Sequence, residues 1–276
     1  SGIVDTEFLL QPGGILGTIK IVEDHNLISS IGSVGSRFDR LEIDAGQSLD
    51  VRDPVYVNWI NNGVNSNFRV HSNSQGSLNV IDALSFANYG VVDLSASSGE
   101  FSASMNNFPG SVFHVGSKSI VNNGATNFSS GSIFSLDLKN ANEVGSLKSD
   151  TVQLLDGALL NVNIANAHEF YDAEGSSYTI VESVNKEDST VNAIGDENIS
   201  VNSVSGNTYG LLAFSTSESD SNLILNIKRG DLATSYNANQ NEVDILFQQG
   251  LHLNAIEIKS TETYNKNLLK SLKKFK

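Results

Sequence analysis

Hydrophobic and polar residues alternate in short segments over residues 1–164, and glycine separates the segments. The clearest segment places Leu41, Ile43, Leu49 and Val51 on one face, with Gly46 in the middle. Because successive side chains of a strand point to opposite faces, this alternation predicts two short strands that bury one face. Similar segments surround further glycines: Gly76, Gly99, Gly157 and, more weakly, Gly131.

A second set of turns lies between these segments, and each combines asparagine with glycine, the two residues that best tolerate positive φ. Its members are Asn61-Asn62-Gly63, Asn88-Tyr89-Gly90 and Asn122-Asn123-Gly124. At matching positions of stacked turns, asparagine amides can bond to one another in a ladder, so we expect such a ladder here.

The glycines of the first set recur at irregular intervals, and an irregular period of this length is typical of a solenoid. We therefore predict an all-β fold, with a right-handed parallel β-helix over residues 1–164. The alternative that the pattern leaves open is an antiparallel β-sandwich, which also has short strands and Asn-Gly turns.

The composition narrows the classes of function. The chain has no cysteine, which excludes disulfides, thiolate metal sites and a cysteine nucleophile. Its formal net charge of −14 disfavours nucleic acid as a partner, because phosphate contacts need a basic surface. No apolar run reaches the roughly 18–20 residues that a membrane-spanning helix needs. The chain starts at Ser1 without a secretion signal, so we interpret it as a fragment.

Four segments between residues 150 and 243 follow one another in an order that is more informative than any one of them. They are Asp150–Val162 (DTVQLLDGALLNV), Gly175–Ser183 (GSSYTIVES), Asn222–Ile227 (NLILNI) and Asn239–Val243 (NQNEV). In this order they resemble the C-terminal end of bacterial autotransporter (type V secretion) passenger domains.

The resemblance implies a C-terminal β cap over residues 165–230 that assists folding during secretion, as an autochaperone. It also implies that residues 231–276 form a linker toward an outer-membrane β-barrel translocator, and that the protein is secreted or held at the bacterial cell surface. The spacing of apolar residues independently predicts helix in this linker, first over 239–253 and then in the basic tail. The apolar residues of the two segments are Val243, Leu246, Phe247 and Leu251, then Tyr264, Leu268, Leu269, Leu272 and Phe275.

Candidate catalytic and metal-binding residues are scattered. The five histidines, which lack any metal-binding spacing, are His25, His71, His114, His168 and His252. The acids that could line one face, as in a polysaccharide-degrading β-helix, are Asp44, Asp50, Asp82 and Asp93. Their offsets from the turn glycines differ and no basic residue recurs with them, so we interpret them as solvated. We expect no enzyme activity, metal or cofactor.

Arg229-Gly230-Asp231 matches the tripeptide that integrins recognise, and it follows the last predicted strand. A three-residue match arises easily by chance, so it is a weak candidate binding site. The sequence as a whole predicts an adhesin or virulence factor that binds a host cell-surface receptor or glycan through many weak contacts. The alternatives are a β-helical enzyme acting on polysaccharide and a released effector acting on a host receptor.

Overall fold

The protein is described here by a computed structural model that covers residues 2–4, 17–27, 29–72, 80–97, 100–165, 170, 175–203, 212–229, 245–249 and 252–256. Strands dominate these residues, and helix is confined in them to 3-10 turns such as η2 (Asp196–Asn198). None of the described helices is long and apolar enough to cross a membrane. The prediction of an all-β chain with parallel strands is confirmed.

Two sheets contain most of the strands. Sheet 1 has the order β1 (Gly2–Val4), β3 (His25–Leu27), β5 (Ser48–Val51), β7 (Asn67–Val70), β9 (Val91–Asp93), β11 (Val112–His114), β13 (Ile133–Asn140), β16 (Leu159–Ile164) and β19 (Ile199–Ser203), with β14 (Glu143–Val144) beside β13. Sheet 2 has the order β2 (Thr18–Ile21), β4 (Phe38–Ile43), β6 (Val55–Asn62), β8 (Ile81–Asn88), β10 (Glu100–Asn107), β12 (Ser119–Phe128), β15 (Ser146–Leu154), β17 (Ser176–Ser183), β21 (Asn222–Arg229) and β20 (Leu212–Ser219), with β18 (Thr190–Val191) beside β15.

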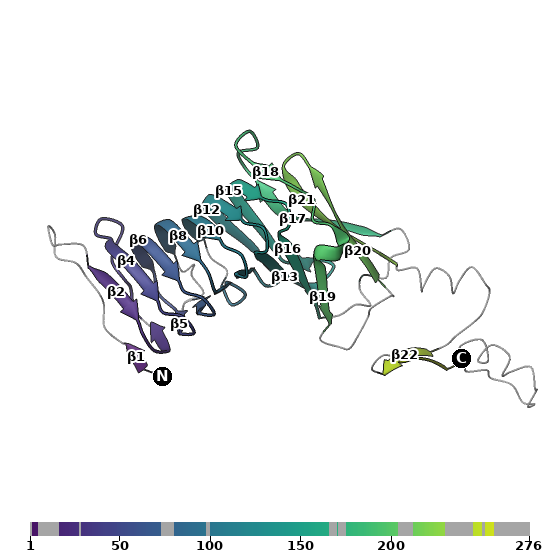
Figure 1. Ribbon diagram of the computed structural model, residues 1–276, viewed down its shortest axis with the longest axis horizontal. Helices are drawn as coiled ribbons and strands as arrows, with labels where there is room; N and C mark the ends of the chain where they lie inside the picture. The colour runs from purple at the N-terminus through teal and green to yellow at the C-terminus, as the bar shows by residue number, and fades with distance from the viewer. Residues whose placement is uncertain are drawn as a thin grey trace, which may run out of the picture.

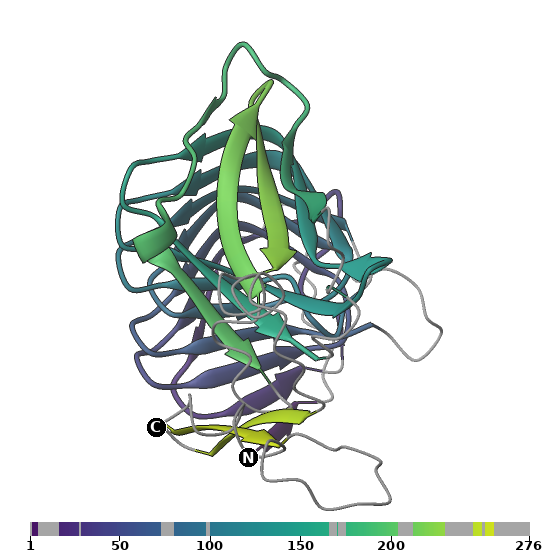
Figure 2. The same ribbon diagram turned by 90° about the vertical axis from the view of Figure 1, so that its right-hand side faces the viewer.

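The chain passes alternately between the two sheets, so each sheet follows the order of the sequence as far as β16. Figure 1 shows the strands stacked side by side along the long axis of the molecule. Figure 2 looks along the stack, and the strands of successive layers overlie one another. We use the term rung for one strand of sheet 2 together with the sheet 1 strand that follows it.

The rungs differ in length, as the irregular spacing of the glycines predicted. In sheet 1, Ser48 lies beside Asn67 at a step of 19 residues, and Arg69 lies beside Asp93 at a step of 24 residues. Further along the stack, His114 lies beside Ser135 at a step of 21 residues. The interval predicted between Gly131 and Gly157 matches a rung, because both glycines lie at the same corner and Ile133 pairs with Leu159. The other predicted intervals involve Gly76 or Gly99, which lie outside the described residues.

Glycines from both predicted sets of turns lie at one corner of the stack. Gly46, Gly63, Gly90, Gly131 and Gly157 all lie in the connection from a sheet 2 strand to the next sheet 1 strand. At this corner Gly46, Gly131 and Gly157 have positive φ, so the turn requires their conformational freedom. Two glycines of the predicted set, Gly76 and Gly99, lie outside the described residues.

The turn predicted at Asn122-Asn123-Gly124 is wrong, because these residues lie inside β12. The register of β12 against β15 shifts between Asn122 and Ala125, which marks a bulge. A β-carbon at position 124 would lie 2.4 Å from the carbonyl oxygen of Ala103 on the neighbouring strand. Glycine is therefore needed here for close backbone approach.

The hydrophobic core lies between the sheets, and the alternating residues identified it correctly. Leu41, Ile43, Leu49 and Val51 are all at most 1% exposed. Phenylalanine rings continue the core along the stack in edge-to-face or tilted contacts 5.4 to 6.1 Å apart, which add to the free energy of burial. The rings in these contacts are Phe68, Phe86, Phe101, Phe113, Phe128 and Phe134.

Sheet 2 changes from parallel to antiparallel pairing after β17. β17 pairs in parallel with β15 but antiparallel with β21, and β21 pairs antiparallel with β20. Asp220 and Ser221 join β20 to β21 with φ of 55° and 57°, the values of a tight hairpin turn. Leu223, Leu225 and Ile227 of β21 are buried in the same core as the rungs.

Residues 245–256 include a hairpin of β22 (Ile245–Gln249) and β23 (His252–Ile256), which pair antiparallel in a sheet of their own. The helix predicted over 239–253 is therefore wrong for 245–249 and 252–253. The pairing runs from Ile245 with Ile256 to Gln249 with His252. The predicted helix from Tyr264 lies outside the described residues.

Candidate functional site

A buried row of asparagine side chains follows the corner between the sheets. The Asn62 Nδ2 donates to Asn88 Oδ1 at 2.9 Å, and Asn88 Nδ2 donates to Asn107 Oδ1 at 2.9 Å. All three side chains are fully buried. The amide ladder predicted from the sequence is thus confirmed for Asn62 and Asn88, while Asn107 was missed. Because solvent does not reach it, this ladder serves the fold and not a ligand.

Asn122, the third predicted member, belongs to a separate polar cluster behind the β12 bulge. Its Nδ2 donates to Thr126 Oγ1 at 2.8 Å and to the carbonyl oxygen of Ala103 at 3.0 Å. The Thr126 hydroxyl in turn lies 2.9 Å from Ser149 Oγ. These bonds satisfy polar groups that the bulge leaves without ladder partners.

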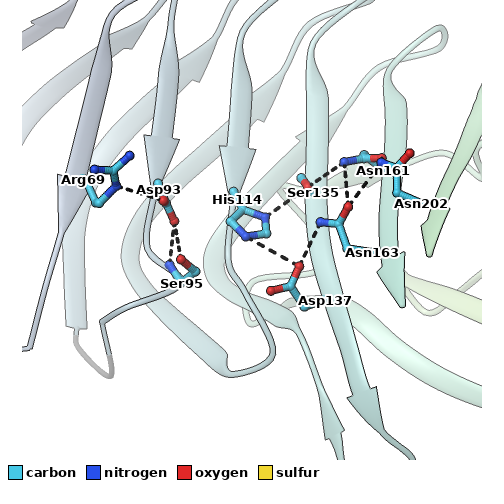
Figure 3. A network of polar contacts seen from close by, with 9 residues as sticks. All are labelled: Arg69, Asp93, Ser95, His114, Ser135, Asp137, Asn161, Asn163 and Asn202. Atoms are coloured by element: carbon cyan, nitrogen blue, oxygen red, sulfur yellow. Dashed lines mark hydrogen bonds and ion pairs between the residues drawn. The ribbon is translucent and has the colours of Figure 1, made fainter. Parts of the chain in front are cut away.

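The outer face of sheet 1 presents polar side chains on one strand after another. One row, aligned by the strand register, contains Asp50 of β5, Arg69 of β7, Asp93 of β9, His114 of β11, Ser135 of β13 and Asn161 of β16. A second row beside it contains Asp137 on β13, Asn163 on β16 and Asn202 on β19. Figure 3 shows the part of these rows from Arg69 to Asn202, with polar contacts that cross the strands. We call the two rows together the outer polar face.

Charged groups form the first half of the outer polar face. Arg69 donates through Nη1 to Asp50 Oδ1 at 3.1 Å and through Nε to Asp93 Oδ2 at 3.2 Å. Asp50 also lies 3.6 Å from His71 Nε2. The guanidinium therefore lies between two carboxylates on its neighbouring strands, and the charges of this half alternate in sign.

Asp93 is ionised more readily than an ordinary aspartate. Burial opposes its ionisation, but bonds from the hydroxyl and the backbone N–H of Ser95, the charge of His114 and the bond from Arg69 outweigh burial. Together they hold the pKa of Asp93 below its usual value. The Ser95 donors lie 2.6 Å (hydroxyl) and 3.0 Å (N–H) from Asp93 Oδ1.

Neutral amides and hydroxyls form most of the second half. His114 bridges the halves, with Nδ1 3.0 Å from Ser135 Oγ and Nε2 3.6 Å from Asp137 Oδ1. Asn163 Nδ2 donates to Asp137 Oδ1 at 2.9 Å. Asn202 Nδ2 donates to Asn161 Oδ1 at 2.8 Å. This half therefore offers both hydrogen-bond donors and hydrogen-bond acceptors, and its charged group is the carboxylate of Asp137.

An apolar row runs beside the polar rows on the same outer face. Val91, Val112, Ile133 and Leu159 occupy aligned positions two residues before the first polar row, and all are partly exposed. Where this row meets η2 there is a hollow of about 330 Å³. The hollow therefore combines an apolar floor with a polar edge, as ligand sites commonly do.

The predicted acids are in part brought together. Asp50 and Asp93 lie on either side of Arg69, so the prediction that no basic residue accompanies the acids is wrong. Sequence spacing misled here because the rungs differ in length. The other two acids pair elsewhere, Asp44 with Lys20 at 3.1 Å and Asp82 with Arg37 at 2.6 Å.

The predicted histidines and the Arg-Gly-Asp tripeptide have different outcomes. His25, His71 and His114 all belong to the sheet 1 side of the stack. Among the described residues there is no group of three or more potential metal ligands. Arg229 is the last residue of β21, whereas Gly230 and Asp231 lie outside the described residues, as does His168.

Sequence reasoning missed the amides of the outer polar face, although a signal was present. Asn161 and Asn163 flank Val162 in a strand whose other face is apolar, so both had to point outward together. Their alignment with Ser135, Asp137 and Asn202 depends on the register between rungs of unequal length. The sequence does not fix that register.

The comparisons with known proteins concern the end of the chain. The model of a domain of unknown function, DUF4143, matches residues 229–276. This match starts at the last residue of β21 and includes the β22–β23 hairpin. No curated protein and no solved structure matches the chain.

Proposed function

We propose that the stack is a right-handed parallel β-helix that belongs to a secreted or surface-held autotransporter passenger and acts in adhesion. Support for the β-helix comes from the alternation between two parallel sheets, in which the sheet 1 strands from β5 to β16 follow one another at steps of 19 to 26 residues. Such stacking suits a long, regular surface, because each rung contacts only its neighbours and repeats the same faces.

The observation that favours adhesion is the outer polar face. It crosses sheet 1 from Asp50 to Asn202 and presents polar groups on every strand of that sheet from β5 to β19. Many weak polar contacts along one face favour avidity over the affinity of a single site. The expected partner is a receptor or glycan on a host cell surface.

The antiparallel hairpin of β20 and β21 is proposed to cap the stack and to assist its folding. Its buried leucines cover the core at this end, and its antiparallel pairing interrupts the parallel stack. At the other end the described residues leave a hollow of about 280 Å³ lined by Ile19, Ile21 and Leu27.

Refolding kinetics test the role of the hairpin in folding. If the hairpin guides folding, Leu225→Ala should slow refolding more than Leu49→Ala does. Equal refolding rates of the two variants would contradict this role.

Residues 231–276 are proposed to lead toward an outer-membrane β-barrel translocator of the same protein. This proposal rests on the order of the four segments between Asp150 and Val243. The DUF4143 match to residues 229–276 has no described function and does not bear on it.

Binding to cultured host cells tests adhesion. The full chain is labelled and offered to the cells either as a soluble protein or densely coupled to beads. We expect coated beads to adhere, the soluble protein to bind weakly, and beads coated with an unrelated acidic protein to stay free. Absence of adhesion by coated beads would contradict the proposed function. Tight, saturable binding by the soluble protein would instead indicate a released effector.

No specific observation favours the alternative of a polysaccharide-degrading enzyme. A glycosidase needs one carboxyl group whose pKa is raised, so that it can donate a proton. Asp93 and Glu143 of the described residues have a lowered pKa instead, Glu143 chiefly through a hydrogen bond from Lys139. Both therefore hold a negative charge instead of a proton.

A further inference from the structure

A hollow of about 330 Å³ lies on the outer face of sheet 1, at the end of the stack that is next to η2. It is open enough to admit a ligand from solvent, and its wall is formed by the residues that lead from η2 into β19. Its lining residues are Val112, Ile133, Leu159, Leu160, Asn161, Glu197, Asn198, Ile199 and Ser200.

The floor of the hollow is apolar. Val112, Ile133 and Leu159 align in register on three neighbouring strands, so their side chains form one continuous strip. Aliphatic strips of this kind can pack against the C–H groups on the face of a sugar ring, which removes apolar surface from water. Aligned strands place the side chains of the strip roughly 4.8 Å apart.

The edge of the hollow provides hydrogen-bonding groups suited to hydroxyls. Asn161 and Ser200 occupy paired positions on β16 and β19 and both line it. Asn202, two residues further along β19, donates to Asn161 Oδ1 at 2.8 Å and to Asn163 Oδ1 at 3.2 Å. Amides and hydroxyls can both donate and accept, as can the hydroxyl groups of a sugar.

The charge of the hollow restricts the ligand further. Glu197 is the charged residue of the lining, which contains no lysine or arginine. The nearest carboxylate of the outer polar face is that of Asp137, bonded to Asn163. Acidic polymers are therefore repelled at this site, and the chain as a whole has a net charge of −14.

We propose that the hollow binds a neutral, linear oligosaccharide, with its sugar faces on the apolar strip and its hydroxyls on the amides of β16 and β19. The inference rests on the proposed adhesive function and names the class of partner. The strip and the polar rows both continue across several strands, so the ligand lies along the stack and spans more than one sugar unit.

Titration calorimetry with defined hexasaccharides tests the proposal. The probes are cellohexaose, chitohexaose and mannohexaose as neutral chains, and hexagalacturonate as the acidic chain. The full chain should bind at least one neutral hexamer and should not bind hexagalacturonate. Failure to bind any of the three neutral hexamers would overturn the proposal, and so would a preference for the acidic one.

Variants locate the site. Asn161→Ala and Asn202→Ala should each weaken binding of the neutral hexamer by about tenfold, which corresponds to about 1.4 kcal/mol. The matched control is Asn127→Ala, which removes an outward amide pair on sheet 2, where Asn127 Nδ2 donates to Asn106 Oδ1 at 2.8 Å. Binding that is unchanged in the two sheet 1 variants, or weakened equally in the control, would overturn the assignment to this hollow.

The bead experiment distinguishes this inference from the proposed function. If beads adhere to cells but the best neutral hexamer does not compete, adhesion stands and the sugar site is wrong. If the hexamer binds the protein but beads do not adhere, the site stands and the adhesive function is wrong. Glu197→Gln should allow weak binding of hexagalacturonate, because it removes the negative charge of the lining; continued exclusion of hexagalacturonate would contradict the role of charge.

Discussion

Two rows of asparagine amides run along the stack in opposite surroundings. Asn62, Asn88 and Asn107 lie at the corner and are fully buried, whereas Asn163 and Asn202 lie on the outer face of sheet 1, where water competes for their bonds. The chemistry of the side chains is the same. A bond lost at the corner leaves buried groups that water does not reach, whereas a bond lost on the outer face can be replaced by a bond to water.

The largest expected effect is that of Asn88→Ala. Asn88 accepts from Asn62 and from the backbone N–H of Gly90, and it donates to Asn107 and to the carbonyl oxygen of Val112. Because several buried groups lose their partner, the free energy of unfolding should fall by about 3 kcal/mol or more. Urea denaturation measures this. The control Asn106→Ala, on the outward face of the same sheet, should cost less than about 1 kcal/mol.

A smaller effect is expected from acid, which should change the contribution of Asp93 to the free energy of unfolding but not that of the buried amides. The pKa of Asp93 is lower in the folded protein than in the unfolded chain, so its contribution to stability is present above the unfolded pKa of about 3.9. It is lost as the pH falls from there through the folded value. The difference in unfolding free energy between wild type and Asp93→Asn should therefore shrink between pH 6 and pH 3.

Asn88→Ala is the control for this pH series, because amides do not titrate. Its cost should be the same at both ends of the range, provided that the protein remains folded. A penalty for Asp93→Asn that does not change with pH would show that the charge of Asp93 contributes nothing to the outer polar face.

The smallest expected effect is that of Asn163→Ala. Its amide donates to Asp137 at 2.9 Å and its carbonyl accepts from Asn202, but both partners can turn to water. The free energy of unfolding should fall by about 0.5 kcal/mol or less. Thermal unfolding of Asn163→Ala and Asn88→Ala, measured side by side, checks this ranking. An equal loss of stability in the two variants would remove the distinction between the two rows of amides.

The sequence predicted the inside of the molecule better than its outside. Alternation identified Leu41 to Val51 as two strands around a turn because burial imposes a strict period of two. It also identified Asn62 and Asn88, which precede a glycine or a short turn. Asn107 was missed because Phe108 and Pro109 follow it and no glycine marks the corner until Gly110.

Other features depend on contacts between strands that are far apart in the sequence, and a local sequence pattern does not predict such contacts. The Asn-Asn-Gly triplet at 61–63 ends a strand, whereas the same triplet at 122–124 lies inside β12, where the register against β15 shifts. The outer polar face depends on register, and the steps between neighbouring strands from β5 to β16 vary from 19 to 26 residues. The helix predicted near Phe247 failed because three apolar residues in a row fit a strand equally well.

The direction of the strands has a mechanical consequence. Strands cross the long axis of the stack, so the hydrogen bonds between rungs point along it (Figure 1). A pull along the axis therefore opens the stack at one end and detaches one rung after another, with no need to break the whole stack at once. A rung of 21 residues, such as the one between His114 and Ser135, releases about 70 Å of chain when extended. A molecule held at both ends would lengthen in steps of this size and absorb sudden loads.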